Sequence, residues 1–437
     1  MNATDTAIAP LVEIERRVQE QAKHQVVDLD TADGRAFLRE LVRRQITQWN
    51  EDHKRGLRPM ALVDVSHLAE RAYRNLAEYG PLSSLLDDDD VWEIMINAPD
   101  AIFVRRHQGT SGYHDEAFHD DDHVVRTLTK LLDDSSTAHR KLDPAEGLQD
   151  AQLDNGARLH IVHQDLARGG HLMVNIRKFT GVAYTSLEQL VDRDMISRSA
   201  AAFLRAAVRS GQTIVVSGSP GAGKTTLLSC CAAELDPTKR VVIAEEVFEA
   251  DVPLANVASM QTRAARVDRE PVDLRRLVAG FLRMAPDVAI VGEVRDREAL
   301  PLLLTLSSGV SGFTTIHAGS ARQALTRLRF VAQLAGSGAE LPLSALNALV
   351  SESIDVVVHC ARTAAGPRVT EIIAVEDLQG GADATQFTTT PVFARRTHDD
   401  PLTWTGQLPA RAQQAFTSHG IDLRDLLDAG GPPEGRP

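Results

Sequence analysis

One glycine-rich segment has residue types and spacing that suit chemistry on phosphates: Gly218-Ser219-Pro220-Gly221-Ala222-Gly223-Lys224-Thr225-Thr226. It fits the P-loop pattern G-x-x-x-x-G-K-[ST]. A β-branched, apolar run precedes it at residues 213–217, and a helix-compatible run follows over 225–235. A strand, this loop and a helix in that order form the context in which the pattern binds phosphate. The segment therefore predicts a nucleoside triphosphate site.

The residue types in this loop each have a chemical reason. The glycines let backbone N–H groups turn inward around the phosphates, and the N-terminus of the following helix adds its partial positive charge. Lys224 is predicted to reach the β- and γ-phosphates, and the Thr225 hydroxyl to hold Mg²⁺. All nine residues from Gly218 to Thr226 are predicted to bind the nucleotide, with ATP and Mg²⁺ as the ligands.

Three further apolar runs end in acids or in a histidine. Residues 241–244 precede Glu245 and Glu246, residues 287–292 precede Glu293, and residues 313–316 precede His317. Strands of a P-loop sheet deliver their carboxyl ends to the nucleotide crevice. Glu293, at the end of a Walker B-like strand, is therefore predicted to orient the water that attacks the nucleotide.

Length and composition limit the possible classes of protein. The chain has 437 residues, of which 43% are apolar, enough for two or three domains. A net charge of −13 disfavours general attraction to nucleic acid or anionic lipid. Three cysteines make neither a disulfide framework nor a zinc site. No apolar run in the sequence approaches the roughly 20 residues that span a bilayer. Residues 1–10 also lack the pattern of a secretory signal peptide. The protein is therefore expected to be cytoplasmic.

The chain falls into four predicted regions. Apolar stripes at helical spacing predict a helical N-terminal segment over residues 1–86. A change to alternating apolar residues predicts an α+β domain over 87–180. The α/β P-loop domain is placed at 181–378. The tail, 379–437, is rich in Gly, Thr, Pro and Asp and is expected to be partly ordered at best.

The order of these motifs resembles the secretion ATPase superfamily, which powers type II and type IV secretion and type IV pili. Within it the chain is most similar to the CpaF/TadA (tight adherence, Flp pilus) branch, over roughly residues 60–375. The matching segments are Tyr79–Leu82, Glu93–Asn97, Asp154–Arg158, Asn175–Phe179, Leu282–Asp287, Gly292–Arg295, Thr314–Ala318 and Ser353–Asp355. The chain lacks the paired C-x-x-C motifs of the zinc-bearing type II branch.

The resemblance implies a RecA-like ATPase domain, a toroidal hexamer, and a nucleotide held between the N-terminal and RecA-like domains. It also implies roles by position. Glu245 and Glu246 match the acidic box, His317 the γ-phosphate sensor, Arg263 the arginine that neutralises transition-state charge, and Arg158 and Arg177 the N-domain arginines near the phosphates. The chain departs from the family where Glu246 replaces the usual Asp and Ser219-Pro220 the commoner Gly-Thr.

A Mg²⁺-dependent ATPase is therefore expected, peripheral to the inner face of the cell membrane, which drives pilus assembly or secretion through an integral inner-membrane platform protein. Three alternatives stay open. The first is a conjugation or type IV secretion traffic ATPase. The second is a nucleic-acid motor with Arg322, Arg327 and Arg329 in a pore, although the net charge makes nucleic acid an unlikely partner. The third is a scaffold that binds ATP without hydrolysing it.

Overall fold

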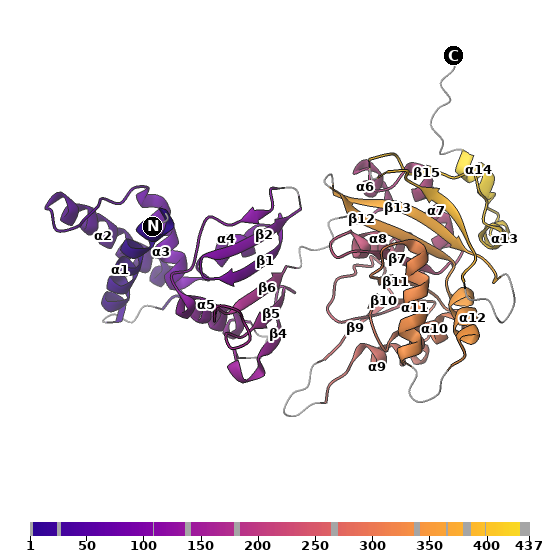
Figure 1. Cartoon of the computed structure of the whole chain (residues 1–437), viewed down its shortest axis with the longest axis horizontal. Coiled ribbons are helices and arrows are strands. Elements are labelled where there is room, and N and C mark those ends of the chain that lie inside the picture. The colour runs from indigo at the N-terminus through magenta and orange to yellow at the C-terminus, as the bar shows by residue number, and fades with distance from the viewer. Residues whose placement is uncertain are drawn as a thin grey trace, which may run out of the picture. The chain divides into compact units, whose positions relative to one another are not determined.

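The structure, a computed structural model, divides the chain into two compact units, 1–180 and 181–437 (Figure 1). It describes residues 3–23, 28–107, 109–135, 141–178, 184–263, 270–335, 341–363, 366–378, 386–397 and 399–428.

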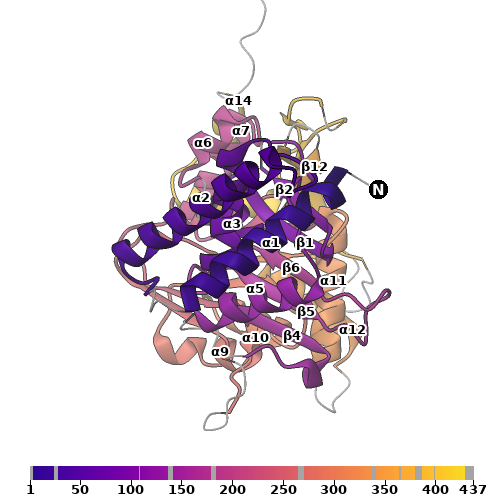
Figure 2. The same cartoon turned by 90° about the vertical axis from the view of Figure 1, so that its left-hand side faces the viewer.

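Three helices open the first unit: α1 (Ala3–Lys23), α2 (Ala32–Lys54) and α3 (Val65–Ala77). Figure 2, in which this unit faces the viewer, shows them side by side. Their apolar stripes share one core that includes Leu11, Val42, Ile46 and Tyr73. Side chains cap two of the helices, since Thr31 accepts a hydrogen bond from Gly34 N, and Asp64 from His67 N.

An antiparallel sheet of six strands follows, in the order β3-β2-β1-β6-β5-β4. The strands are β1 (Val91–Ala98), β2 (Ala101–Arg106), β3 (Gly112–Tyr113), β4 (Leu148–Gln152), β5 (Arg158–Val162) and β6 (Met173–Arg177). Alternate residues such as Ile94 and Ile176 form a core with α4 (Leu82–Asp87) and α5 (Asp121–Asp133). A short 3₁₀ helix, η1 (Pro144–Glu146), precedes β4. The alternation predicted from the sequence thus buries one face of this sheet.

The second unit has a nine-stranded sheet in the order β15-β14-β13-β12-β7-β11-β10-β8-β9. Its parallel part consists of β7 (Ile214–Gly218), β8 (Val241–Glu245), β9 (Val257–Gln261), β10 (Val288–Val294), β11 (Ser311–Ile316) and β12 (Val356–Thr363). Every residue of β7 and β8 is buried, as expected for parallel strands covered on both faces. β13 (Gly366–Val375) pairs with β12 in the antiparallel sense.

Helices cover both faces of this sheet, so that alternate β7 residues enter different cores. Ile214 and Val216 pack with α6 (Leu187–Asp192), α7 (Arg198–Arg209) and α8 (Lys224–Ala232). Val215 packs on the other face with α9 (Leu274–Val278), α10 (Ala299–Leu306), α11 (Ala321–Ala335) and α12 (Leu343–Ser353). The 3₁₀ helix η2 (Phe281–Met284) lies on that second face. This covered parallel sheet with a P-loop after its central strand is the expected RecA-like α/β fold.

Residues 386–397 and 399–428 of the tail, for which the sequence predicts partial order at best, form regular elements. These form β14 (Thr389–Ala394), β15 (Thr403–Trp404), α13 (Ala410–Ser418) and α14 (Leu423–Asp428). The buried rings of Phe393 and Phe416 pack against Phe203 of α7, at centroid distances of 5.8 and 5.6 Å. Arg411 pairs with Asp355 at 2.6 Å. A few apolar side chains in a polar segment thus suffice, because they join a core built elsewhere.

Asp355 also fixes the strand that leads to the P-loop. Its carboxylate accepts the Thr213 N–H at 2.8 Å, directly before β7, while Arg411 holds it from α13. We call residues 386–397 and 399–428 the C-terminal lobe. The lobe is therefore part of the second unit rather than an appendage.

None of the helices in the described part of the chain has both the length and the apolar character needed to cross a membrane.

Replacing Phe416 with Ala is expected to lower the free energy of unfolding by about 3–5 kcal/mol, because a fully buried ring leaves a cavity. Phe330→Ala is the matched control, since that ring is 56% exposed, and a change of about 1 kcal/mol or less is expected. Urea unfolding of the full chain measures both. Equal stability of the two variants would mean that the C-terminal lobe does not belong to the core.

Candidate nucleotide site

The P-loop connects β7 to α8 with a backbone that glycine alone adopts readily. Gly221 and Gly223 have φ values of +71° and +83°. A Cβ on Gly218 would lie 2.2 Å from the carbonyl oxygen of Cys360 on the neighbouring strand, β12. No side chain caps the N-terminus of α8. Its first N–H groups thus remain suited to an anion.

Lys224 lies inside this loop with only 7% of its surface exposed. Its Nζ donates to the carbonyl oxygen of Ser219 at 3.0 Å and lies 3.3 Å from His317 Nδ1. Arg362 donates to the carbonyl oxygen of Gly221 at 3.2 Å. The lysine is therefore held at the centre of the loop, beside the end of β11.

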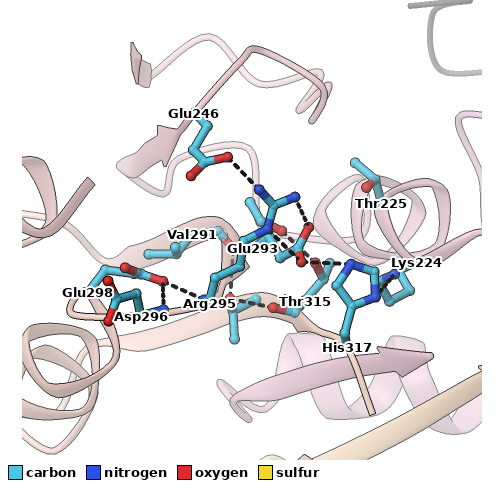
Figure 3. Close-up of polar contacts among 12 residues, drawn as sticks. Lys224, Thr225, Glu246, Val291, Glu293, Arg295, Asp296, Glu298, Thr315 and His317 are labelled. Carbon is cyan, nitrogen blue, oxygen red and sulfur yellow. Dashed lines mark hydrogen bonds and ion pairs between the residues drawn. The ribbon is translucent and has the colours of Figure 1, made fainter. Parts of the chain in front are cut away.

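Glu293 and His317 meet next to the P-loop, as Figure 3 shows. His317 Nε2 lies 2.8 Å from Glu293 Oε1, and His317 Nδ1 lies 3.1 Å from the carbonyl oxygen of Gly218. The histidine thus bridges the P-loop and the Walker B carboxylate. The structure brings together Lys224, Glu293 and His317, which the sequence places on three separate segments.

Arg295 is the site residue to which the sequence reasoning gave no role. Its Nε lies 2.9 Å from Glu293 Oε1, and its Nη2 donates to Glu293 Oε2 at 2.9 Å. Its Nη1 donates to Glu246 at 2.7 Å, so it joins β10 to the end of β8 (Figure 3). Arg295 directly follows β10, where the strand pattern ends, so alternation along the strand does not predict its partner.

The surroundings of Glu293 favour its ionised form. Burial acts most strongly and would raise the pKa, but the contacts with His317 and Arg295, together with their charges, outweigh it. The pKa falls from 4.5 to about 2. Glu293 is thus a carboxylate at any working pH.

The two acidic-box residues do different things. Glu245 is 2% exposed, and its Oε1 accepts the N–H groups of Glu249 and Ala250 at 3.1 and 2.9 Å. It packs so closely on Gly292 that a Cβ there would lie 2.9 Å from Glu245 Cγ. Glu245 therefore orders the loop after β8, whereas Glu246 reaches Arg295.

The oxygen donors near Thr225 suit Mg²⁺. The Thr225 hydroxyl donates to Glu249 Oε2 at 3.4 Å, and hydroxyl and carboxylate oxygens are ligands that this ion accepts. Within the described residues, no group of three or more His, Cys, Asp or Glu side chains forms a metal site by itself.

The structure does not bring Arg263 to this cluster. Arg263 follows β9, pairs its backbone with Val272, and donates from its side chain to the carbonyl oxygen of Glu270 at 3.1 Å. The arginine in contact with Glu293 is Arg295 instead. A role for Arg263 at the phosphates stays a prediction.

Arg158 and Arg177 belong to the first unit of the chain. They are directly opposite each other on β5 and β6, and Arg177 is also opposite Glu93 on β1. Like charges directly opposite in a sheet are destabilising. The two arginines are thus cross-strand neighbours beside Glu93, and their contact with a nucleotide also stays a prediction.

The ionised Glu293 predicts a pH dependence of stability. Its folded pKa of about 2 lies below 4.5, so its contribution is fully present above pH 4.5 and is lost as the pH falls through 2. Between pH 6 and pH 3, wild type should lose about 2 kcal/mol more unfolding free energy than Glu293→Gln. Urea unfolding across that range measures it. Parallel curves for the two proteins would contradict the charged environment described above.

Comparison with known proteins identifies the family of the chain. The family model for type II/IV secretion system proteins matches residues 75–388. The putative conjugal transfer protein Rv3659c of Mycobacterium tuberculosis is 31% identical over 314 residues, covering 70% of this chain and 86% of the relative. The type IV secretion system protein PtlH of Bordetella pertussis is 32% identical over 302 residues, covering 64% of this chain and 88% of the relative.

Solved structures of similar proteins include the VirB11 ATPase of the Brucella suis type IV secretion system. It is 25% identical, with a TM-score of 0.35, and the match covers 67% of this chain and 94% of that one. The Legionella pneumophila ATPase DotB is 15% identical, with a TM-score of 0.46, over 79% and 84% of the two chains. On the family match and the curated relatives, the chain belongs to the type II/IV secretion system ATPase superfamily.

Proposed function

We propose that the chain is a Mg²⁺-dependent ATP hydrolase that drives pilus assembly or protein secretion. One observation supports it above all: Lys224 of the P-loop lies beside the His317–Glu293 pair, at the carboxyl ends of neighbouring strands. Membership of the secretion ATPase superfamily supports the same reaction.

The residues suggest how hydrolysis proceeds. The P-loop N–H groups and Lys224 hold the phosphates, and Thr225 with Glu249 is placed to hold Mg²⁺, which neutralises phosphate charge when bound. Water attacks the γ-phosphorus and a new P–O bond forms. The bond to the bridging oxygen breaks, and ADP leaves with the electron pair. Glu293 takes the proton that the water loses, and inorganic phosphate is the second product.

The wider assembly belongs to the same proposal. The chain works as a homo-hexamer in which Arg158 and Arg177 approach the phosphates from the first unit, with Arg263 as a further cation. An integral inner-membrane platform protein receives the motion, so the ring lies peripherally at the cytoplasmic face of the membrane. The assignment to the CpaF/TadA branch rests on the segment resemblance alone.

A conjugation or type IV secretion traffic ATPase is the second candidate function. Curated relatives favour it, since they are named as conjugal transfer and type IV secretion proteins. The conjugal transfer protein TrbB of Rhizobium radiobacter is 34% identical over 231 residues, covering 49% of this chain and 68% of the relative. The chemistry is shared by both candidates, and only the cargo differs.

A nucleic-acid motor is less well supported than either. Two of the three arginines expected to line a pore have structural partners. Arg322 donates to the Phe387 carbonyl oxygen and to Thr389, and Arg329 donates to Asn347. These contacts attach α11 to the C-terminal lobe and to α12.

Glu293→Gln is expected to lower kcat for ATP hydrolysis by at least about 100-fold, because the proton acceptor is lost, with nucleotide affinity kept. Lys224→Ala should instead weaken binding of a fluorescent ATP analogue, since a central charge contact is removed. Steady-state phosphate release and fluorescence titration measure the two effects. Tight ATP binding with equal, near-zero turnover in wild type and Glu293→Gln would instead identify a non-hydrolysing scaffold.

Arg158→Gln and Arg177→Gln are expected to reduce kcat by about tenfold or more, because each removes charge that stabilises the transition state. Arg105→Gln is the matched control. Arg105 lies two strands from Arg177 and pairs with Glu93 at 3.3 Å. The turnover per chain should also rise with protein concentration if assembly of a ring completes the site. Unchanged rates in both variants would remove these arginines from the mechanism.

A further inference from the structure

The ion pairs of Arg295 suggest that this residue controls how readily Glu293 accepts a proton. We propose that Arg295 is a positioning residue that clamps both carboxylate oxygens of Glu293, and that Glu246 draws the guanidinium away when Glu293 must accept a proton. The inference rests on the proposed function, because it presumes that Glu293 is the proton acceptor.

The clamp is visible in the geometry (Figure 3). Two nitrogens of Arg295 face the two oxygens of Glu293, each pair at 2.9 Å. The hydrogen bond from Nη2 to Oε2 is charge-assisted and therefore stronger than a neutral one, and Nε adds an ion pair to Oε1 without hydrogen-bond geometry. His317 lies 2.8 Å from Oε1 as well. Water that approaches Glu293 must therefore compete with a cation for each oxygen.

The clamp has a chemical consequence. A base becomes weaker as its pKa falls, and the pKa of Glu293 is about 2 in this arrangement. Burial, the largest influence, acts to raise that pKa. Once Arg295 withdraws, burial is opposed by fewer cations, and Glu293 becomes a stronger base.

Glu246 is placed to receive the guanidinium. It lies directly after β8, the strand that pairs with β10, and already accepts Arg295 Nη1 at 2.7 Å. Its side chain is 48% exposed and that of Arg295 is 43% exposed, whereas that of Glu293 is 22% exposed. The guanidinium can thus shift towards Glu246 without burying a charge.

The other charged groups around Glu293 do not offer this path. They are Glu245 on β8, Glu249 after it, Lys224 at the start of α8, and His317 after β11. Glu245 Oε1 accepts hydrogen bonds from the backbone N–H groups of Glu249 and Ala250. Glu249 accepts the hydrogen bond of the Thr225 hydroxyl, and its charge acts on Arg295 as well, less than that of Glu246. Only Glu246 shares Arg295 with Glu293 through a direct hydrogen bond among the contacts that the structure describes.

A double-mutant cycle tests this model with Arg295→Gln, Glu246→Gln and the double variant. Arg295→Gln should raise kcat by about three- to tenfold, because Glu293 becomes a stronger base. This gain is only a small part of the rate acceleration that general-base catalysis can supply. It should also shift the acid limb of the pH–rate profile towards 4.5, the ordinary carboxyl pKa. Glu246→Gln should lower kcat, because Arg295 then stays on Glu293. The double variant should follow Arg295→Gln.

Two further variants control the cycle. Arg297→Gln removes the same charge from an exposed residue two positions on and should leave rate and profile as in wild type. Arg295→Lys keeps the charge without the two-point geometry, so its rate should lie between wild type and Arg295→Gln. Circular dichroism and binding of a fluorescent ATP analogue establish that each variant folds and binds.

The outcomes separate the two proposals. Loss of turnover in Glu293→Gln, from an active wild type, supports the proposed function by itself. With that established, a slower Arg295→Gln with an unshifted pH profile overturns the clamp. A double variant with the same low kcat as Glu246→Gln would also overturn the clamp, because Glu246 would then act on the reaction directly and not through Arg295. An inactive wild type, or an active Glu293→Gln, overturns the proposed function instead.

Discussion

The candidate site depends on the alignment of four buried parallel strands. β7, β11, β10 and β8 are neighbours in one sheet, so their carboxyl ends reach the same edge. That edge holds the P-loop, His317, Glu293 and Glu246. Because both faces of the sheet are covered, none of these strands can shift its register without exposing a core. The precision of the site thus comes from hydrophobic burial below it.

Polar contacts then refine what the strands bring together. His317 links the P-loop to Glu293, and Arg295 links Glu293 to Glu246. Each contact joins residues at the ends of different strands, or residues two apart in the chain. The result is a row of contacts from Lys224 to Glu246 in which each group restrains the next. The contacts of Glu293 with His317 and Arg295 explain why it stays ionised despite its burial.

Much of this arrangement could be predicted from the sequence, because local patterns determine it. Apolar runs that end in Glu293 or His317 identify buried strands and the edge they reach. The RecA-like fold and the superfamily were predicted correctly from the resemblance of the ordered motifs to the secretion ATPase superfamily. Arg295 received no role, since a strand pattern does not say which partner a charged side chain selects. The C-terminal lobe was missed because Phe393 and Phe416 lie in a mainly polar stretch. The residue on which they pack, Phe203, is far from them in the sequence, so no local pattern indicates the contact.

The contacts of Asp355 have a consequence for how the protein is made. Thr213, before the P-loop strand, is fixed by a residue that is itself held by Arg411, close to the end of the chain. A ribosome releases residues in order, and domains fold as units once they have emerged. The first unit, 1–180, can thus form during translation. The sheet that carries the P-loop stays incomplete until Asp355 and Arg411 have emerged, so the strand before the P-loop is fixed later than the first unit.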